Sequence, residues 1–189
     1  MTTDEIFSLI ASHMAKGLLI HNQLACAFNF LNLCGYKKCH EYHYFEETYH
    51  YRCLKDFYVD NYGKLIIEKQ EEMPEIIPLN WFKHIKNDVD ANTKRAAIKD
   101  LMKIWVDWEK ETKKLLENCY KQLYEQDEIC AALKIAECLQ DVSKELTYAE
   151  EKQINLDSSG YDISIIIDKQ NSLKKKYQEK IKNIYKDDE

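Results

Sequence analysis

The sequence predicts an all-α protein, built as an antiparallel four-helix bundle with an additional helix at its C-terminal end. Two observations support this fold class. Only 4 glycines and 2 prolines occur among the 189 residues, which is too few for the many turns of an all-β protein. Apolar residues make up 45% of the chain and recur at the three- and four-residue spacing of a helix face.

The first predicted helix begins at the N-terminus and ends near Gly35. Thr2 and Glu5 stand three residues apart, which is the signature of a capping box at a helix start. A second helix is predicted over about 37–71, where apolar residues again recur at helical spacing. Since so short a turn separates two long helices, we expect them to lie antiparallel.

Both prolines of the chain, Pro74 and Pro78, fall in one segment, and the second helix cannot continue through it. The connection that follows is predicted to last to about residue 92, with a short helix of its own between Trp81 and Lys86. The second and third helices are therefore joined by a long crossover.

Three further helices are predicted after the crossover. The third covers about 92–126, and Asp127 is the predicted N-cap of a fourth that ends near residue 155. A break over 155–160 then precedes a fifth helix, over about 162–185. The order of connections in the bundle is thus short, long, short.

A four-helix bundle with one long crossover has the ferritin-like arrangement. We expect a single domain over residues 1–189, with the bundle over about 3–155 and the fifth helix added to it. An apolar stripe on the fifth helix must cover either its own bundle or a neighbouring subunit, because a monomer tolerates little exposed apolar surface. We therefore expect self-association. The stripe consists of Ile163, Ile166, Ile167, Leu173 and Ile181.

Charge and cysteine content exclude several classes of protein. The net charge is −6, with acidic and basic residues interspersed, whereas a surface for DNA or RNA needs a basic face. The apolar runs are too short to span a membrane. The 7 cysteines include no C-x-x-C pair, and the N-terminus does not resemble a signal peptide. We expect a cytoplasmic protein with no nucleic-acid or membrane partner.

The turn between the first two helices carries a motif. The run Leu31-Asn32-Leu33-Cys34-Gly35 is followed, ten residues after its glycine, by Phe45-Glu46-Glu47-Thr48-Tyr49. This resembles the Dps mini-ferritins, whose pattern here is roughly H-W-N-x-x-G and then L-H-E-x-F-E-E-L-Y. The match covers about residues 28–66, a fifth of the chain. The resemblance implies a ferritin-like fold and a protein that oxidises and stores iron.

The sequence departs from the Dps pattern at the iron ligands. The family's ferroxidase ligands, carried over position by position, fall on Phe30, Tyr42, Phe57 and Asn61. None of these side chains is an ordinary iron ligand of such a site. Acidic and histidine side chains lie one or two positions away, but one residue is about 100° of helical rotation and moves a ligand off the facing surface.

A second group of residues predicts a different metal site. Glu47 and His50 form an E-x-x-H pair, and residues three apart share one face of a helix. His43 lies within about 60° of this pair by helical rotation. If the first two helices mirror each other about Gly35-Tyr36, His21 lies opposite His50. The predicted ligands are thus His21, His43, Glu47 and His50, and imidazole with carboxylate suits iron, zinc or manganese.

The alternative interpretation is structural, with buried histidine and glutamate side chains hydrogen-bonded to the many tyrosines. The third helix has its apolar face centred on Trp105 and Trp108, with Glu109 about 80° to one side. In the fourth helix, Glu137 lies opposite the apolar stripe and Glu150 only near the end. The sequence leaves both interpretations open.

Two functions follow from these observations. The first is a ferritin-like bundle without a ferroxidase centre, acting as a self-associating or partner-binding scaffold. The alternative is a mini-ferritin-like protein that binds iron in its first two helices. One carboxylate among several imidazoles suits a single tightly held ion better than a turnover site. We therefore expect no rapid oxidation of ferrous iron, whichever metal is bound.

Overall fold

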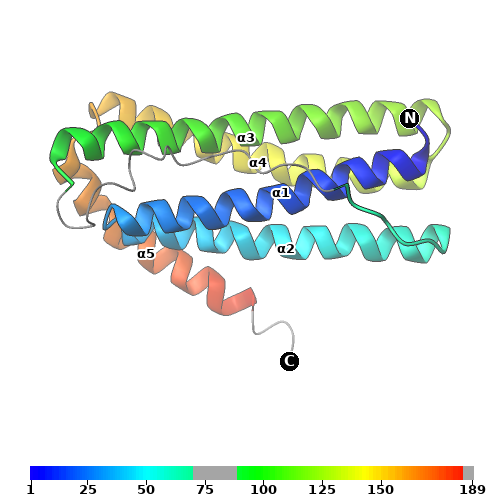
Figure 1. Cartoon of the computed structure of the whole chain (residues 1–189), viewed down its shortest axis with the longest axis horizontal. Helices are drawn as coiled ribbons and strands as arrows, with labels where there is room; N and C mark the ends of the chain where they lie inside the picture. Colours follow the sequence, from blue (N-terminus) through cyan, green and yellow to red (C-terminus); the bar gives the residue numbers. More distant parts are fainter. Residues whose placement is uncertain (70–88, 185–189) are drawn as a thin grey trace.

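The computed structural model describes residues 1–69 and 89–184. These residues form helices and no strand, so the all-α prediction is confirmed. Figure 1 shows the long helices side by side, with the last helix running diagonally back along the second. The helices are α1 (Thr3–Phe30), α2 (Cys34–Tyr62), α3 (Ala91–Glu125), α4 (Ile129–Ser158) and α5 (Ile163–Ile184).

The bundle consists of two helical hairpins. α1 packs along α2, α3 packs along α4, and α1 also contacts α3, while α5 packs mainly on α2. The long connection predicted between the second and third helices joins the two hairpins. The proline segment and the short helix predicted between Trp81 and Lys86 lie outside the described residues.

The first helix begins as predicted and ends earlier. Thr2 Oγ1 accepts from the Glu5 amide at 3.3 Å, and the Glu5 carboxylate accepts from the Thr2 amide at 2.8 Å, which completes the capping box. α1 stops at Phe30 rather than near Gly35, because Asn32 adopts a left-handed φ of 59°. The chain therefore reverses at 31–33, several residues before the predicted turn.

The ends of α2 and α4 also differ from the prediction. α2 stops at Tyr62, not near residue 71, because Gly63 takes a left-handed φ of 63° and its amide donates to the Val59 carbonyl at 2.8 Å. Asp127 does not cap α4, since its own φ is 59° and the N-cap position falls on Glu128. α4 continues to Ser158, past the predicted break.

A layer of polar side chains divides the apolar core into two clusters. One cluster lies toward the start of α1 and the other toward the hairpin turn. The first includes Ile6, Phe7, Ile10, Leu54, Tyr58, Leu116, Leu123 and Ile135. The second includes Leu24, Phe28, Leu31, Ile98, Leu101, Trp105, Leu146 and Tyr177. The middle of the bundle, between the two apolar clusters, is therefore polar.

α5 covers its own bundle rather than standing free. Ile166 and Tyr177 are its buried residues and belong to the second apolar cluster, whereas Ile167 of the predicted stripe is 43% exposed. Self-association stays a prediction. Among residues 1–69 and 89–184, none of the helices has the length and apolar content needed to cross a membrane.

Gly35 allows α2 and α5 to approach each other closely, and this contact can be tested. A Cβ at Gly35 would lie 2.3 Å from the carbonyl oxygen of Gln170, which is backbone and cannot rotate away. We expect Gly35→Ala to lower the free energy of unfolding by about 1–3 kcal/mol, because α5 must shift to accommodate the methyl group. Thermal unfolding and amide hydrogen exchange over α5 measure the effect.

The matched control is Cys34→Ala, at the exposed neighbouring position. It should leave the unfolding temperature and the exchange of α5 unchanged. If Gly35→Ala behaved like this control, the close approach of the two backbones would be wrong.

Candidate metal centre

The polar layer at the middle of the bundle contains histidines and glutamates from all four bundle helices. Most of them are buried and the other two partly so, although charged side chains seldom are unless they are paired or bind a metal. The layer is made of His21 from α1, His40, His43, Glu46 and Glu47 from α2, Glu109 from α3, and Glu145 from α4.

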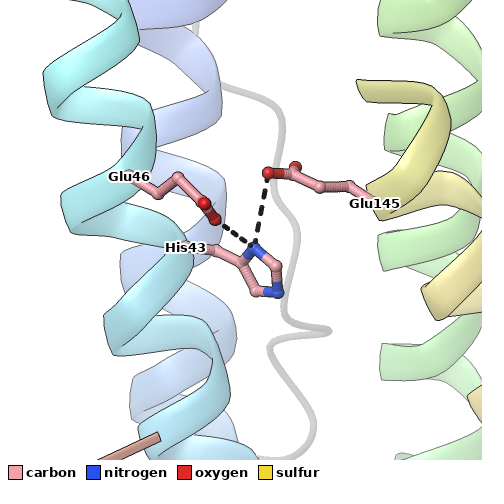
Figure 2. Close-up of side chains that lie close together, drawn as sticks. All are labelled: His43, Glu46 and Glu145. Carbon is pink, nitrogen blue, oxygen red and sulfur yellow. Dashed lines mark ion pairs between the residues drawn. The ribbon is translucent and has the colours of Figure 1, made fainter. Parts of the chain in front are cut away.

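Three of these side chains gather closely enough to hold one ion. His43 Nδ1 lies 3.6 Å from a Glu46 carboxylate oxygen and 3.8 Å from a Glu145 carboxylate oxygen. One ligand atom from each of the three lies within 4.8 Å of the others. Figure 2 shows His43 and Glu46 pointing from α2 toward Glu145 of α4. We call His43, Glu46 and Glu145 the ligand trio.

The local structure explains how the ligand trio forms. His43 and Glu46 are three residues apart on α2 and therefore lie on the same face of that helix. Tyr42 Oη donates a hydrogen bond of 2.7 Å to the second oxygen of Glu46, which fixes the orientation of its carboxylate. Glu145 completes the group from the opposite side of the bundle.

A second contact lies beside the ligand trio. His21 Nε2 is 3.6 Å from a carboxylate oxygen of Glu109, and both side chains are fully buried. Trp105 Nε1 donates to the same Glu109 oxygen at 3.1 Å. The ring of His21 stacks on that of His43 with 5.3 Å between centroids, so the two groups of side chains adjoin.

Several buried polar atoms of this layer have no hydrogen-bond partner. The unpartnered atoms around the ligand trio are His21 Nε2, both ring nitrogens of His43, Glu109 Oε2 and Glu145 Oε2. Each such atom costs about 1–3 kcal/mol when it is left unsatisfied. A bound cation would satisfy imidazole nitrogens and carboxylate oxygens together, so this donor set fits a divalent transition metal.

Burial controls the protonation of the carboxyl groups. Burial raises the pKa of Glu109 to about 7 and also raises the pKa of Glu145. The pKa of Glu47 lies well above its usual value because of burial and the nearby carboxylates of Glu145 and Glu109. Burial therefore favours the protonated form of these carboxyl groups, and a metal ion would displace such protons.

The pKa values of His21 and His43 are shifted in opposite directions. Burial, with a smaller contribution from the neighbouring His43, lowers the pKa of His21 to about 3, so His21 is neutral. Burial also acts to lower the pKa of His43, but the Cys39 thiol and the carboxylates of Glu145 and Glu46 outweigh it and raise that pKa well above the usual value. His43 thus holds a proton where the ligand trio would hold a cation.

The structure places the four ligands predicted from the sequence in different surroundings. His21, His43 and Glu47 lie in the buried polar layer. His50 does not join the ligand trio, since its side chain is 23% exposed and its nearest carboxylate, that of Asp141, is 3.9 Å away. His21 contacts His40 and His43 instead of His50, because the chain reverses at 31–33 and the pairing of α1 with α2 shifts by about two turns.

The sequence analysis missed Glu46, Glu109 and Glu145. Glu109 is fully buried because α3 buries a wide face, which also includes Trp105, Val106 and Trp108. Glu145 follows the buried Val142 by three residues, and this spacing was a signal of its inward position. The layer therefore contains four carboxylates, rather than the single one expected.

A solved structure shares this architecture. A ferritin from Archaeoglobus fulgidus, engineered into a closed form, superposes with a TM-score of 0.73 and 14% sequence identity, over 92% of this chain and 96% of that chain. No protein-family model matches the sequence, and no curated protein matches it. The narrower resemblance to Dps mini-ferritins stays a prediction. The chain has the all-α, ferritin-like helical-bundle fold.

Proposed function

We propose that this protein binds a divalent transition-metal ion at the ligand trio. The observation that carries the proposal is the set of buried, unpartnered imidazole and carboxylate atoms that converge from α2 and α4. Iron, zinc and manganese all accept this donor set. His21, Glu47 and Glu109 adjoin the trio and are proposed to support the ion or its water. The described residues contain no comparable feature in favour of the scaffold hypothesis.

Removing one ligand should weaken metal binding without unfolding the protein. We expect Glu145→Gln, which keeps the size of the side chain, to reduce the affinity for zinc or iron(II) by at least about 100-fold, the upper end of the loss seen when an outer-shell partner is removed. Isothermal titration and metal analysis of protein purified without chelator measure the affinity and the stoichiometry.

Two further variants make this experiment decisive. Glu150→Gln makes the same chemical change on α4, at an exposed side chain paired with Lys110, and should leave metal binding intact. His50→Ala decides whether the fourth ligand predicted from the sequence takes part, and we expect no loss of stoichiometry. Equal affinity in wild type and Glu145→Gln would contradict the proposed site.

Glu109 should stabilise the protein as an acid and destabilise it as an anion. Its raised pKa means that this stabilisation is complete below about pH 4.5 and is lost as the pH rises through about 7. We therefore expect Glu109→Gln to make the metal-free protein more stable at pH 8 by on the order of 2–3 kcal/mol, and to have little effect at pH 5. Urea unfolding at the two pH values measures the difference.

The exposed neighbour on the same helix provides the control for this prediction. Glu111→Gln should change stability by less than about 0.5 kcal/mol at either pH. If Glu109→Gln were less stable than wild type at pH 8, the claim that the buried Glu109 carboxylate destabilises the protein would be wrong.

We expect the site not to oxidise ferrous iron faster than buffer alone. The ligand trio gathers around one point, whereas a di-iron carboxylate centre holds two ions. Absorbance of ferric product after aerobic addition of iron(II) checks this. A fast phase in wild type that Glu145→Gln abolishes would establish ferroxidase activity instead.

A further inference from the structure

The ligand trio lines a cleft that opens between α2, α4 and α5. The cleft has a volume of about 320 Å³, which is enough for a small organic molecule. Its wall includes three tyrosines, and its rim includes three lysines. These residues are Tyr42, Tyr148 and Tyr177, with Lys144, Lys176 and Lys180.

The tyrosines form an aromatic wall next to His43. Tyr177 of α5 is buried, and its ring centroid lies 6.2 Å from that of His43 and 5.4 Å from that of Tyr42. The ring of Tyr148, on α4, lies 6.4 Å from that of Tyr177 in an edge-to-face arrangement. A ligand in the cleft would therefore contact aromatic surface on one side and the metal ligands on another.

Two lysines hold their charges over this wall. Lys176 Nζ lies 4.8 Å from the ring centroid of Tyr148, and Lys180 Nζ lies 4.3 Å from that of Tyr42. Within residues 1–69 and 89–184, neither ammonium group forms an ion pair with a carboxylate, whereas Lys144 pairs with Asp141 at 2.8 Å. Both ammonium groups also lie over the ring of Tyr177, with Nζ of Lys176 at 5.2 Å and that of Lys180 at 5.6 Å from its centroid.

The charges around the cleft favour an anion once an ion is bound. The two carboxylates of the ligand trio would balance a divalent cation, and Asp141 balances Lys144. Lys176 and Lys180 are then left without a balancing charge. An inorganic anion would use the ammonium groups and leave the tyrosine rings unused, whereas an organic carboxylate would use both.

We propose that this cleft binds a small organic carboxylate. Its anionic group lies between the metal ion and the ammonium groups of Lys176 and Lys180, and its apolar body packs against the partly exposed rings of Tyr42 and Tyr148. The proposal rests on the metal site proposed above. It makes α5, which is added to the four-helix bundle, the element that selects the ligand.

The test titrates benzoate into protein loaded with cobalt(II), an ion that accepts the same ligands and absorbs visible light. Metal stoichiometry is measured first. We expect benzoate to change the visible cobalt bands with saturation, and to bind at least about 10-fold more tightly than inorganic phosphate or the uncharged benzyl alcohol.

A double substitution separates the cleft from the metal site. Lys176→Met with Lys180→Met keeps the apolar stems, and should weaken benzoate by about 10-fold or more while metal affinity changes less than about 3-fold. The control pair, Lys175→Met with Lys182→Met, removes the same charge from exposed positions of α5 and should bind benzoate as wild type does.

The remaining outcomes contradict either the metal site or the carboxylate site. Protein that binds no metal would overturn both the metal site and this inference. Full metal loading with no effect of benzoate, or equal affinity in the two lysine pairs, would overturn the carboxylate site alone. Phosphate binding more tightly than benzoate would show an oxyanion site that does not use the tyrosines.

Discussion

The burial of ionisable side chains at the centre of the bundle is the constraint on which the rest of the structure depends. A glutamate taken out of water is tolerated only if it is protonated, paired or bound to a cation. Glu109, with its raised pKa, contacts His21 and Trp105, and Glu145 faces the protonated His43. The two apolar clusters on either side hold these groups apart from solvent. Burying these ionisable groups therefore lowers the stability of the bundle at its centre.

The fifth helix covers the side of the four-helix bundle on which His43 lies. Without Tyr177, the space between α2 and α4 would expose the His43 ring to water. Gly35 lets α5 approach α2 backbone to backbone, and the residue belongs to the same motif that carries the Dps resemblance. One residue of this chain therefore belongs to the turn motif and also allows α5 to pack closely on α2.

Helical spacing predicted the five helices, because apolar periodicity and the Thr2 capping box are local properties. The helix ends were less predictable, since Asn32, Gly63 and Asp127 adopt left-handed backbone conformations that several residue types tolerate. An error of a few residues at the first turn shifted His21 by about two turns relative to α2, so its partners were wrong. Glu145 was missed because its position depends on packing between α2 and α4, which no single helix reveals.

The position of α5 at the end of the chain has a consequence for biosynthesis. Chains emerge from the ribosome N-terminus first, so α2 and α4 leave it before α5 does. His43 and Glu145 belong to those earlier helices, whereas Tyr177, Lys176 and Lys180 belong to the last one. The helices that carry the ligand trio, and with them Tyr42 and Tyr148, therefore emerge before Tyr177 can pack beside His43. An ion at the proposed site would have open access until α5 packs onto the bundle.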